Sequence, residues 1–251
     1  MKLHPLIAAA GLVLAAIAPA SADFKAEARQ VFTDKAPSVI GVRGLLKIEA
    51  SMNGKPAGSQ DKQLHTNGVV IADDLIAVAY RTLKPDVSAS LGKRPGLTVE
   101  TELSELKLIT PDGEEYDAKL VLHDEDLGVA FVAVDPKGEN ADGFSIEPLD
   151  VSKDVTVQQL DDLIAIGRLP EKLRSVARVN IATVAAIVER PRMIYICQGI
   201  SMSNPVFNAS GDFIGLSVAI KNTGAAPVIM PAKYIRKVMD QAKTKQAELA
   251  K

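Results

Sequence analysis

The sequence predicts an all-β protein in two blocks of about six short strands, with a short helix at each end. Many short apolar or alternating runs are separated by turn residues, which is the pattern of a β-sandwich or barrel. A polar stretch at 135–143 divides these runs into two sets. Near the C-terminus the spacing becomes helical, because Ile235, Val238, Met239 and Ala242 fall on one apolar stripe.

The first 22 residues have the organisation of a cleavable secretory signal. Lys2 precedes an apolar run at 6–18, and Ala20-Ser21-Ala22 fits the small-residue rule of signal peptidase. A membrane anchor is the alternative, but a run of about 13 residues is shorter than the roughly 20 that a spanning helix needs. We expect cleavage after Ala22, a periplasmic or secreted protein, and no membrane span once the signal is removed.

The expected elements follow in order. A helix is predicted at 24–35, and Ala36-Pro37 ends it. Strands of the first block are expected at 38–48, 68–72, 75–80, 97–110, 118–122 and 129–134, and strands of the second at 155–166, 176–189, 194–197, 205–208, 213–220 and 228–230. Pro231 is expected to open the C-terminal helix. The segments are then a signal (1–22), a helix (23–37), a first block (38–143), a second block (144–231) and a closing helix (232–251).

Composition excludes several classes of function. The formal net charge of −2 gives no reason to expect a nucleic-acid partner. Cys197 is the only cysteine, so no intramolecular disulfide forms, and its apolar surroundings predict a buried structural thiol. Histidine and cysteine are too few to suggest a metal site. There is no Gly-rich phosphate loop, and we expect no cofactor.

The order of motifs resembles the trypsin-like serine proteases, in particular their bacterial HtrA (DegP-like) branch. The similarity runs from about residue 36 to residue 241. Residues 38–42 resemble SVVxV, 67–71 GSGVII, 74–78 GLIVT, 111–121 DGREYPAKVV, 124–132 DxxxDLALLKI, 163–167 VIAIG, 182–187 GIVSA, and 204–216 GPLVN…GEVIGI. The resemblance implies two six-stranded antiparallel β-barrels of the chymotrypsin type. No PDZ-like region is expected after the C-terminal helix, so substrate capture by such a domain is not carried over.

The base of the catalytic triad is altered. The family's histidine motif, TNxHVV or TAxHVV, matches residues 78–83 and puts Arg81 at the histidine, or Tyr80 if the register shifts by one. Arginine stays protonated near neutral pH and cannot accept a proton from serine. Asp126 matches the triad aspartate, although a solvated loop carboxylate is an equally good interpretation.

The nucleophile is altered as well. The family's motif GNSGGP corresponds to residues 200–205, which puts Met202 at the serine. A thioether has no proton to lose and cannot attack a carbonyl. Ile200 stands at the glycine that supplies an oxyanion-hole amide, and a β-branched residue resists the backbone angles that glycine accepts.

Two functions remain open. The first is an exported, inactive protease homologue that binds a polypeptide in its cleft by strand addition. The second is an active serine endopeptidase with a rearranged site, in which Ser203 or Ser201 is the nucleophile and His123 or His65 the base. Neither histidine falls on the family's position. The sequence does not indicate the oligomeric state.

The first prediction concerns processing. If the N-terminal segment is a signal peptide, the exported protein begins at Asp23. Expression with the native N-terminus in a Gram-negative host, followed by intact-mass analysis of the periplasmic fraction, checks this. A protein that keeps residues 1–22 and stays with the membrane would instead support the anchor.

Overall fold

The structure, a computed structural model, describes residues 20–87, 94–220 and 226–249. The apolar run at 6–18 lies outside this part. Helix α1 (Ala20–Lys35) begins four residues before the predicted helix, and a single 3-10 turn, η1 (Ala36–Ser38), leads into the first strand. In the described residues no helix is long and apolar enough to cross a membrane.

Two closed antiparallel barrels of six strands each confirm the predicted fold class. The first has the order β1-β2-β3-β6-β5-β4, and the second β10-β11-β12-β9-β8-β7. The first-barrel strands are β1 (Val39–Met52), β2 (Lys55–Ala72), β3 (Leu75–Ala79), β4 (Leu97–Ile109), β5 (Glu115–Asp124) and β6 (Val129–Val134). The second-barrel strands are β7 (Asp162–Arg168), β8 (Ala177–Val188), β9 (Ile194–Cys197), β10 (Pro205–Phe207), β11 (Phe213–Val218) and β12 (Val228–Pro231). Short helical turns lie at α2 (Tyr80–Leu83), η2 (Ala141–Gly143) and η3 (Glu171–Leu173).

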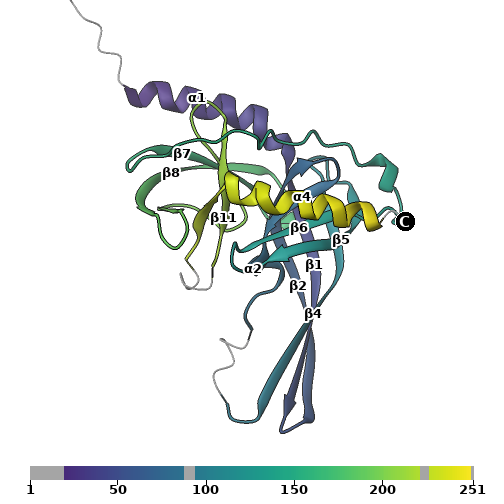
Figure 1. The fold of residues 1–251 in the computed structure, drawn as a ribbon. Helices are drawn as coiled ribbons and strands as arrows, with labels where there is room; N and C mark the ends of the chain where they lie inside the picture. Colours follow the sequence, from purple (N-terminus) through teal and green to yellow (C-terminus); the bar gives the residue numbers. More distant parts are fainter. Residues whose placement is uncertain (1–19, 88–93, 221–225, 250–251) are drawn as a thin grey trace, which may run out of the picture.

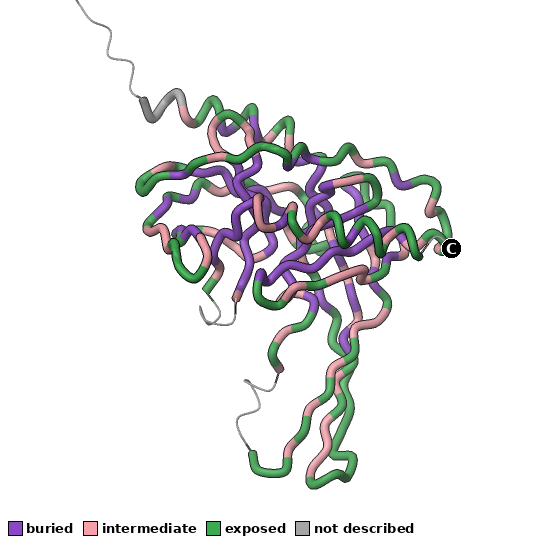
Figure 2. Tube along the Cα trace, viewed as in Figure 1, coloured by how far each residue is buried: buried purple, intermediate pink, exposed green. Residues whose placement is uncertain are grey.

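Strand β2 is much longer than the predicted 68–72. Together with β1 and β4 it extends past the barrel as a three-stranded arm, which points away from the body in Figure 1. Residues 55–63 of β2 are all exposed, and Figure 2 shows the arm as green and pink. Because neither face of this stretch is buried, it lacks the apolar alternation by which a strand is recognised in sequence.

The second barrel corrects two predicted boundaries. The strand expected at 155–166 begins only at Asp162, because residues 155–158 have no regular structure and residues 159–160 form a turn; of this stretch Val157 is buried against the barrel. Pro231 is the last residue of β12, where it pairs with Gly215, and the helix α4 (Ala232–Leu249) begins one residue later.

Both terminal helices hold the barrels together. Helix α1 packs along β7, with Ala28 and Val31 in the large core cluster that residues of both barrels share. Helix α4 crosses from β11 and β12 to β5 and β6, as Figure 1 shows, and buries Ile235 and Ala242. Cys197 is buried in the second barrel, and burial raises the pKa of its thiol to about 11, which confirms the structural interpretation.

Gly128 lies at a close contact between the two barrels. It ends the turn between β5 and β6 with φ +70°, and a Cβ atom there would lie 2.6 Å from the carbonyl oxygen of Ala219 in the second barrel. Its own carbonyl accepts a 2.8 Å hydrogen bond from the amide of Tyr80. The turn therefore needs glycine for two reasons, the left-handed backbone and the close contact.

We predict that Gly128→Ala lowers the free energy of unfolding by about 3 kcal/mol, since strain of about 1–2 kcal/mol is joined by a steric clash. Gly113→Ala is the matched control. Gly113 also has a positive φ, +95°, but a Cβ atom there would meet nothing within 4 Å. Guanidinium denaturation of both variants measures the difference, and equal losses would contradict the close contact.

Candidate functional site

The expected nucleophile loop ends in a buried hydrogen-bond network between the barrels. Ser203 is fully buried, and its hydroxyl accepts a 2.8 Å hydrogen bond from the amide of Ala79 at the end of β3. The same hydroxyl donates to the carbonyl of Asn67 on β2 at 2.6 Å. Ser203 has φ +61°, and its amide donates to the carbonyl of Ser217 at 2.7 Å. These bonds hold a backbone conformation that costs a serine roughly 1–2 kcal/mol.

Asn67 and Asn204 extend the network across the junction. The Asn67 amide group donates to Asn204 Oδ1 at 2.7 Å, and Asn67 Oδ1 accepts from the backbone amide of Arg168 at 3.0 Å. Strand β7 passes so close to this pair that a Cβ atom on Gly167 would lie 2.6 Å from Asn204 Oδ1. Glycine at 167 is thus required by the side chains that face it.

Arg168 is a buried cation whose partners are backbone carbonyls. Its guanidinium donates to Val39, to Ser175 at 2.9 Å and to Ala36 at 3.1 Å. Burial lowers the pKa of this guanidinium, because the charged form has lost water. The side chain fastens the start of β1 to the second barrel.

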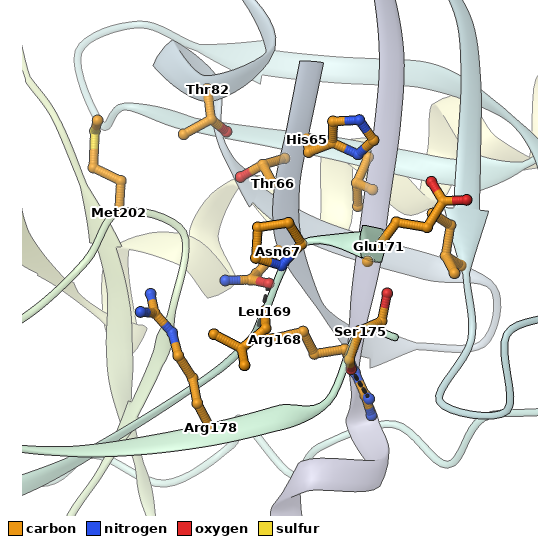
Figure 3. A pocket seen from close by; sticks show the side chains of 14 residues that line it. His65, Thr66, Asn67, Thr82, Arg168, Leu169, Glu171, Ser175, Arg178 and Met202 are labelled. Atoms are coloured by element: carbon orange, nitrogen blue, oxygen red, sulfur yellow. Dashed lines mark hydrogen bonds between the residues drawn. The ribbon is translucent and has the colours of Figure 1, made fainter. Parts of the chain in front are cut away.

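A cleft of about 320 Å³ opens beside this network. Its first-barrel wall comes from β1, β2, β4 and α2. Its second-barrel wall comes from the end of β7, the start of β8, the segment that joins them and the loop before β10. Figure 3 shows Thr82 and Met202 toward one end and Glu171 toward the other. The lining residues are Gly41, Val42, His65, Thr66, Asn67, Thr82, Ile109, Arg168, Leu169, Pro170, Glu171, Ser175, Arg178 and Met202.

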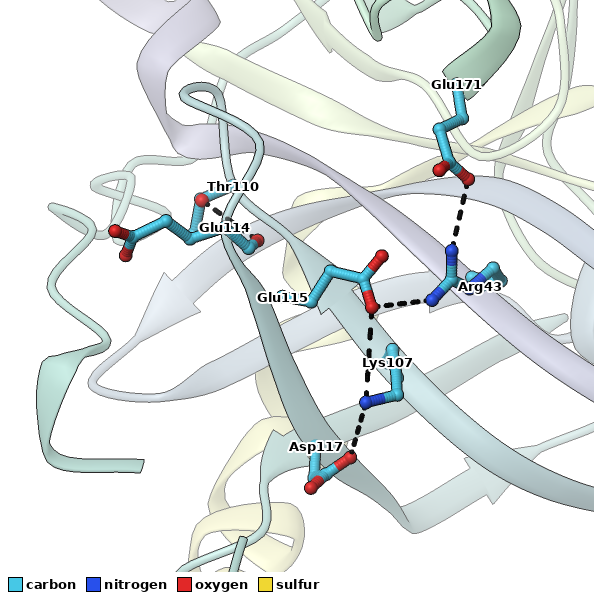
Figure 4. Close-up of polar contacts among 7 residues, drawn as sticks. All are labelled: Arg43, Lys107, Thr110, Glu114, Glu115, Asp117 and Glu171. Carbon is cyan, nitrogen blue, oxygen red and sulfur yellow. Dashed lines mark hydrogen bonds and ion pairs between the residues drawn. The ribbon is translucent and has the colours of Figure 1, made fainter. Parts of the chain in front are cut away.

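An ion-pair chain spans the barrels at the Glu171 end. Arg43 on β1 contacts Glu171 of the second barrel at 3.1 Å and Glu115 of its own barrel at 2.6 Å. Lys107 continues the chain to Glu115 at 4.0 Å and to Asp117 at 3.0 Å (Figure 4). The Arg43–Glu171 pair holds the segment between β7 and β8 against the first barrel.

Among the residues matched to the triad, only Met202 lines this cleft. Met202 is half-buried, and its neighbour across the cleft is Thr82. Arg81 lines a separate cavity with Tyr80 and Glu125. Asp126 is exposed in the turn between β5 and β6. The structure therefore does not bring Arg81, Asp126 and Met202 into one cavity.

The side chain of Tyr80 is buried and lies against the turn that contains Asp126. Its hydroxyl contacts Glu125 at 3.2 Å, and its ring stacks on His123 with centroids 4.5 Å apart. Burial first, and then the Glu125 charge, raise the pKa of Tyr80. A phenol in this state is deprotonated even less at neutral pH than an ordinary one, so it is less available as a base.

Neither histidine hydrogen-bonds to a serine within the described ranges. His65 is exposed at the cleft, and His123 is exposed where it stacks on Tyr80. Ser201 takes part in the network through its carbonyl, which accepts from the hydroxyl of Ser217. In the same ranges no group of three or more His, Cys, Asp or Glu side chains is placed to hold a metal ion.

Sequence reasoning missed Asn67, Arg168, Arg178 and Ser217. Single polar residues within or beside apolar strands carry no periodic signal. One signal was present: residues 203 and 204 match two glycines of GNSGGP, yet they are serine and asparagine. Two polar side chains in place of glycines indicate that these side chains themselves fill space that stays open in the family's loop.

The paired six-stranded barrels, with this loop at their junction, define a protein of the chymotrypsin-like class. Residues 66–216 match the trypsin-like peptidase domain, and the chain belongs to this family. The crystal structure of Deg5 is similar, with a TM-score of 0.55 and 16% sequence identity over 85% of this chain and 92% of that chain, which supports the fold. No curated protein matches the sequence significantly.

We predict that Ser203→Ala destabilises the protein by about 1–3 kcal/mol, because it leaves the Ala79 amide and the Asn67 carbonyl buried without a partner. Ser201→Ala is the control, since the network uses the carbonyl of Ser201, and we expect a change within about 0.5 kcal/mol. Urea denaturation measures both. An unchanged stability in Ser203→Ala would show that the hydroxyl is not part of the junction.

Proposed function

We propose that this chain is an exported, proteolytically inactive member of the trypsin-like family that binds an extended polypeptide in the cleft between its barrels. One observation carries the proposal. The position matched to the nucleophile holds the thioether of Met202, and the adjacent hydroxyl of Ser203 is buried with both its donor and its acceptor capacity in use. Acyl transfer needs a hydroxyl or thiol that a base activates and a substrate reaches.

The surroundings of the loop also argue against proteolysis. A triad needs an imidazole within hydrogen-bond reach of the nucleophile. Arg81 cannot serve as a base at neutral pH, and it lines another cavity than Met202 does. His65 lies at the cleft but has no recorded serine partner among the described residues.

The cleft has the character of a polypeptide site. Its lining combines apolar residues, among them Val42, Ile109 and Leu169, with polar residues from both barrels. Pockets of this kind bind by apolar contact and use a few polar groups for orientation. A volume of about 320 Å³ accommodates two or three residues of an extended chain rather than a folded domain.

The alternative, an active endopeptidase that uses Ser203 or Ser201, is less well supported. Exposure of the Ser203 hydroxyl would break the bonds to Ala79 and Asn67. Ser201 is not among the residues that line the cleft.

We predict that the purified chain is not labelled by a fluorophosphonate probe and does not cleave casein above the background of Ser201→Ala and Ser203→Ala. Trypsin in the same assay is the positive control. If the parent chain is labelled or cleaves casein, and Ser201→Ala or Ser203→Ala abolishes this activity, the proposal is wrong and the rearranged protease is supported. Export is tested separately by the periplasmic mass measurement.

Peptide binding is tested with pools of fluorescent octapeptides by anisotropy. We expect binding that Thr66→Trp weakens about tenfold or more, because Thr66 lines the cleft and an indole would fill it. Gln63→Trp, on the exposed part of β2 outside the cleft, should bind as the parent chain does. Equal binding by both variants would place the peptide elsewhere.

A further inference from the structure

The cleft contains an arginine whose charge has no recorded partner. Arg178, near the start of β8, extends toward Met202 in Figure 3. Its Nε atom is buried and lacks a hydrogen-bond partner in the described part of the chain, where no ion pair is recorded for it either. Because burying a donor without an acceptor is costly, a ligand that supplies an acceptor to this guanidinium is favoured.

The charges around the cleft leave it positive. Its lining includes the residues Arg168, Arg178 and Glu171, and the guanidinium of Arg168 is buried behind the lining. Arg168 is bound to carbonyls, which do not cancel its charge. Glu171 is already paired with Arg43 at 3.1 Å. The low-dielectric walls of a cleft strengthen such a field and favour an anionic group.

We propose that Arg178 binds a carboxylate of the polypeptide in the cleft, either its C-terminal carboxylate or an Asp or Glu side chain. A guanidinium presents pairs of parallel N–H donors, which match the two oxygens of a carboxylate. Met202 and Leu169 in the same lining provide apolar contact for the rest of the peptide. This inference rests on the proposed function and adds the chemical class of the ligand.

The cleft fits a carboxylate on a peptide better than a bare multivalent anion. Within the described residues, Arg178 is the lining arginine with a buried donor that lacks an acceptor, whereas the guanidinium of Arg168 is hydrogen-bonded to three carbonyls. The remaining lining is largely apolar or uncharged. One bidentate contact flanked by apolar walls suits one carboxylate on an apolar chain.

The test uses four pools of fluorescein-labelled octapeptides of Ala, Leu, Val and Ser. The first has an amidated C-terminus, the second a free C-terminal carboxylate, the third an amidated C-terminus with one internal Glu, and the fourth Gln in place of that Glu. We expect the second or third pool to bind about tenfold more tightly than its neutral counterpart. The pool that binds more tightly identifies the source of the carboxylate.

Variants assign the preference to Arg178. Arg178→Gln should remove the advantage of the acidic pool, and Arg178→Lys should keep only part of it, because an ammonium group lacks the planar fork. Lys172→Gln, an exposed cation in the adjoining turn and outside the lining, is the control and should change nothing. Competition on the unmodified chain needs no variant: acetate should displace the acidic pool and acetamide should not.

The outcomes separate this inference from the proposed function. If neutral and acidic pools bind equally, and Thr66→Trp weakens both, the cleft binds peptides and the carboxylate preference is wrong. If no pool binds the parent chain, both proposals are wrong. An acidic preference that persists in folded Arg178→Gln would overturn the assignment to Arg178.

Discussion

The hydrogen bonds of Ser203 are the interaction on which this two-barrel structure depends. One hydroxyl joins the loop before β10 to the end of β3 and to β2, elements of two separately closed barrels. A polar group that is buried away from solvent must find its hydrogen-bond partners inside the protein, and hydrogen-bond geometry allows few positions for those partners. Asn67, Asn204 and the Arg168 amide continue the same network, and the glycine at 167 gives it room. The barrels are thus held in one relative position by specific bonds as well as by the apolar cluster that they share.

The same network accounts for the chemistry that the site supports. A nucleophile must be reachable and close to a base, whereas a junction residue must be buried and fully bonded. The hydroxyl of Ser203 satisfies the second condition, so it fails the first. Where the family motif has two glycines, Ser203 and Asn204 put side chains into the junction, and Met202 turns an apolar thioether to the cleft. The altered residues act together as a structural unit.

The sequence predicted the fold well and the site only in part. Apolar runs with turns between them located most strands, because burial leaves a periodic pattern along the chain. The arm of β2 and residues 155–161 did not follow that rule. The arm is a strand without a buried face, and residues 155–161 are an irregular stretch and a turn in which only Val157 is buried. The contacts of Asn67 join residues more than a hundred positions apart, and no local pattern encodes such a pair. Motif matching located Met202 at the cleft, but it could not show that Arg81 points into a different cavity.

The Arg43–Glu171 pair helps to explain how the cleft keeps its shape. The Glu171 side chain is about half exposed, and an ion pair of this kind contributes at most about 1 kcal/mol to stability. Its effect is on position, because it fixes the segment between β7 and β8 against the first barrel at one end of the cleft. Arg168 fixes both ends of that segment. Its backbone amide donates to Asn67 at the β7 end, and its guanidinium donates to the Ser175 carbonyl near the β8 end. Arg178 follows three residues after Ser175, so its guanidinium is presented to the cleft by a backbone held at both sides. A preformed wall of this kind lowers the entropy cost of binding for any ligand that enters the cleft.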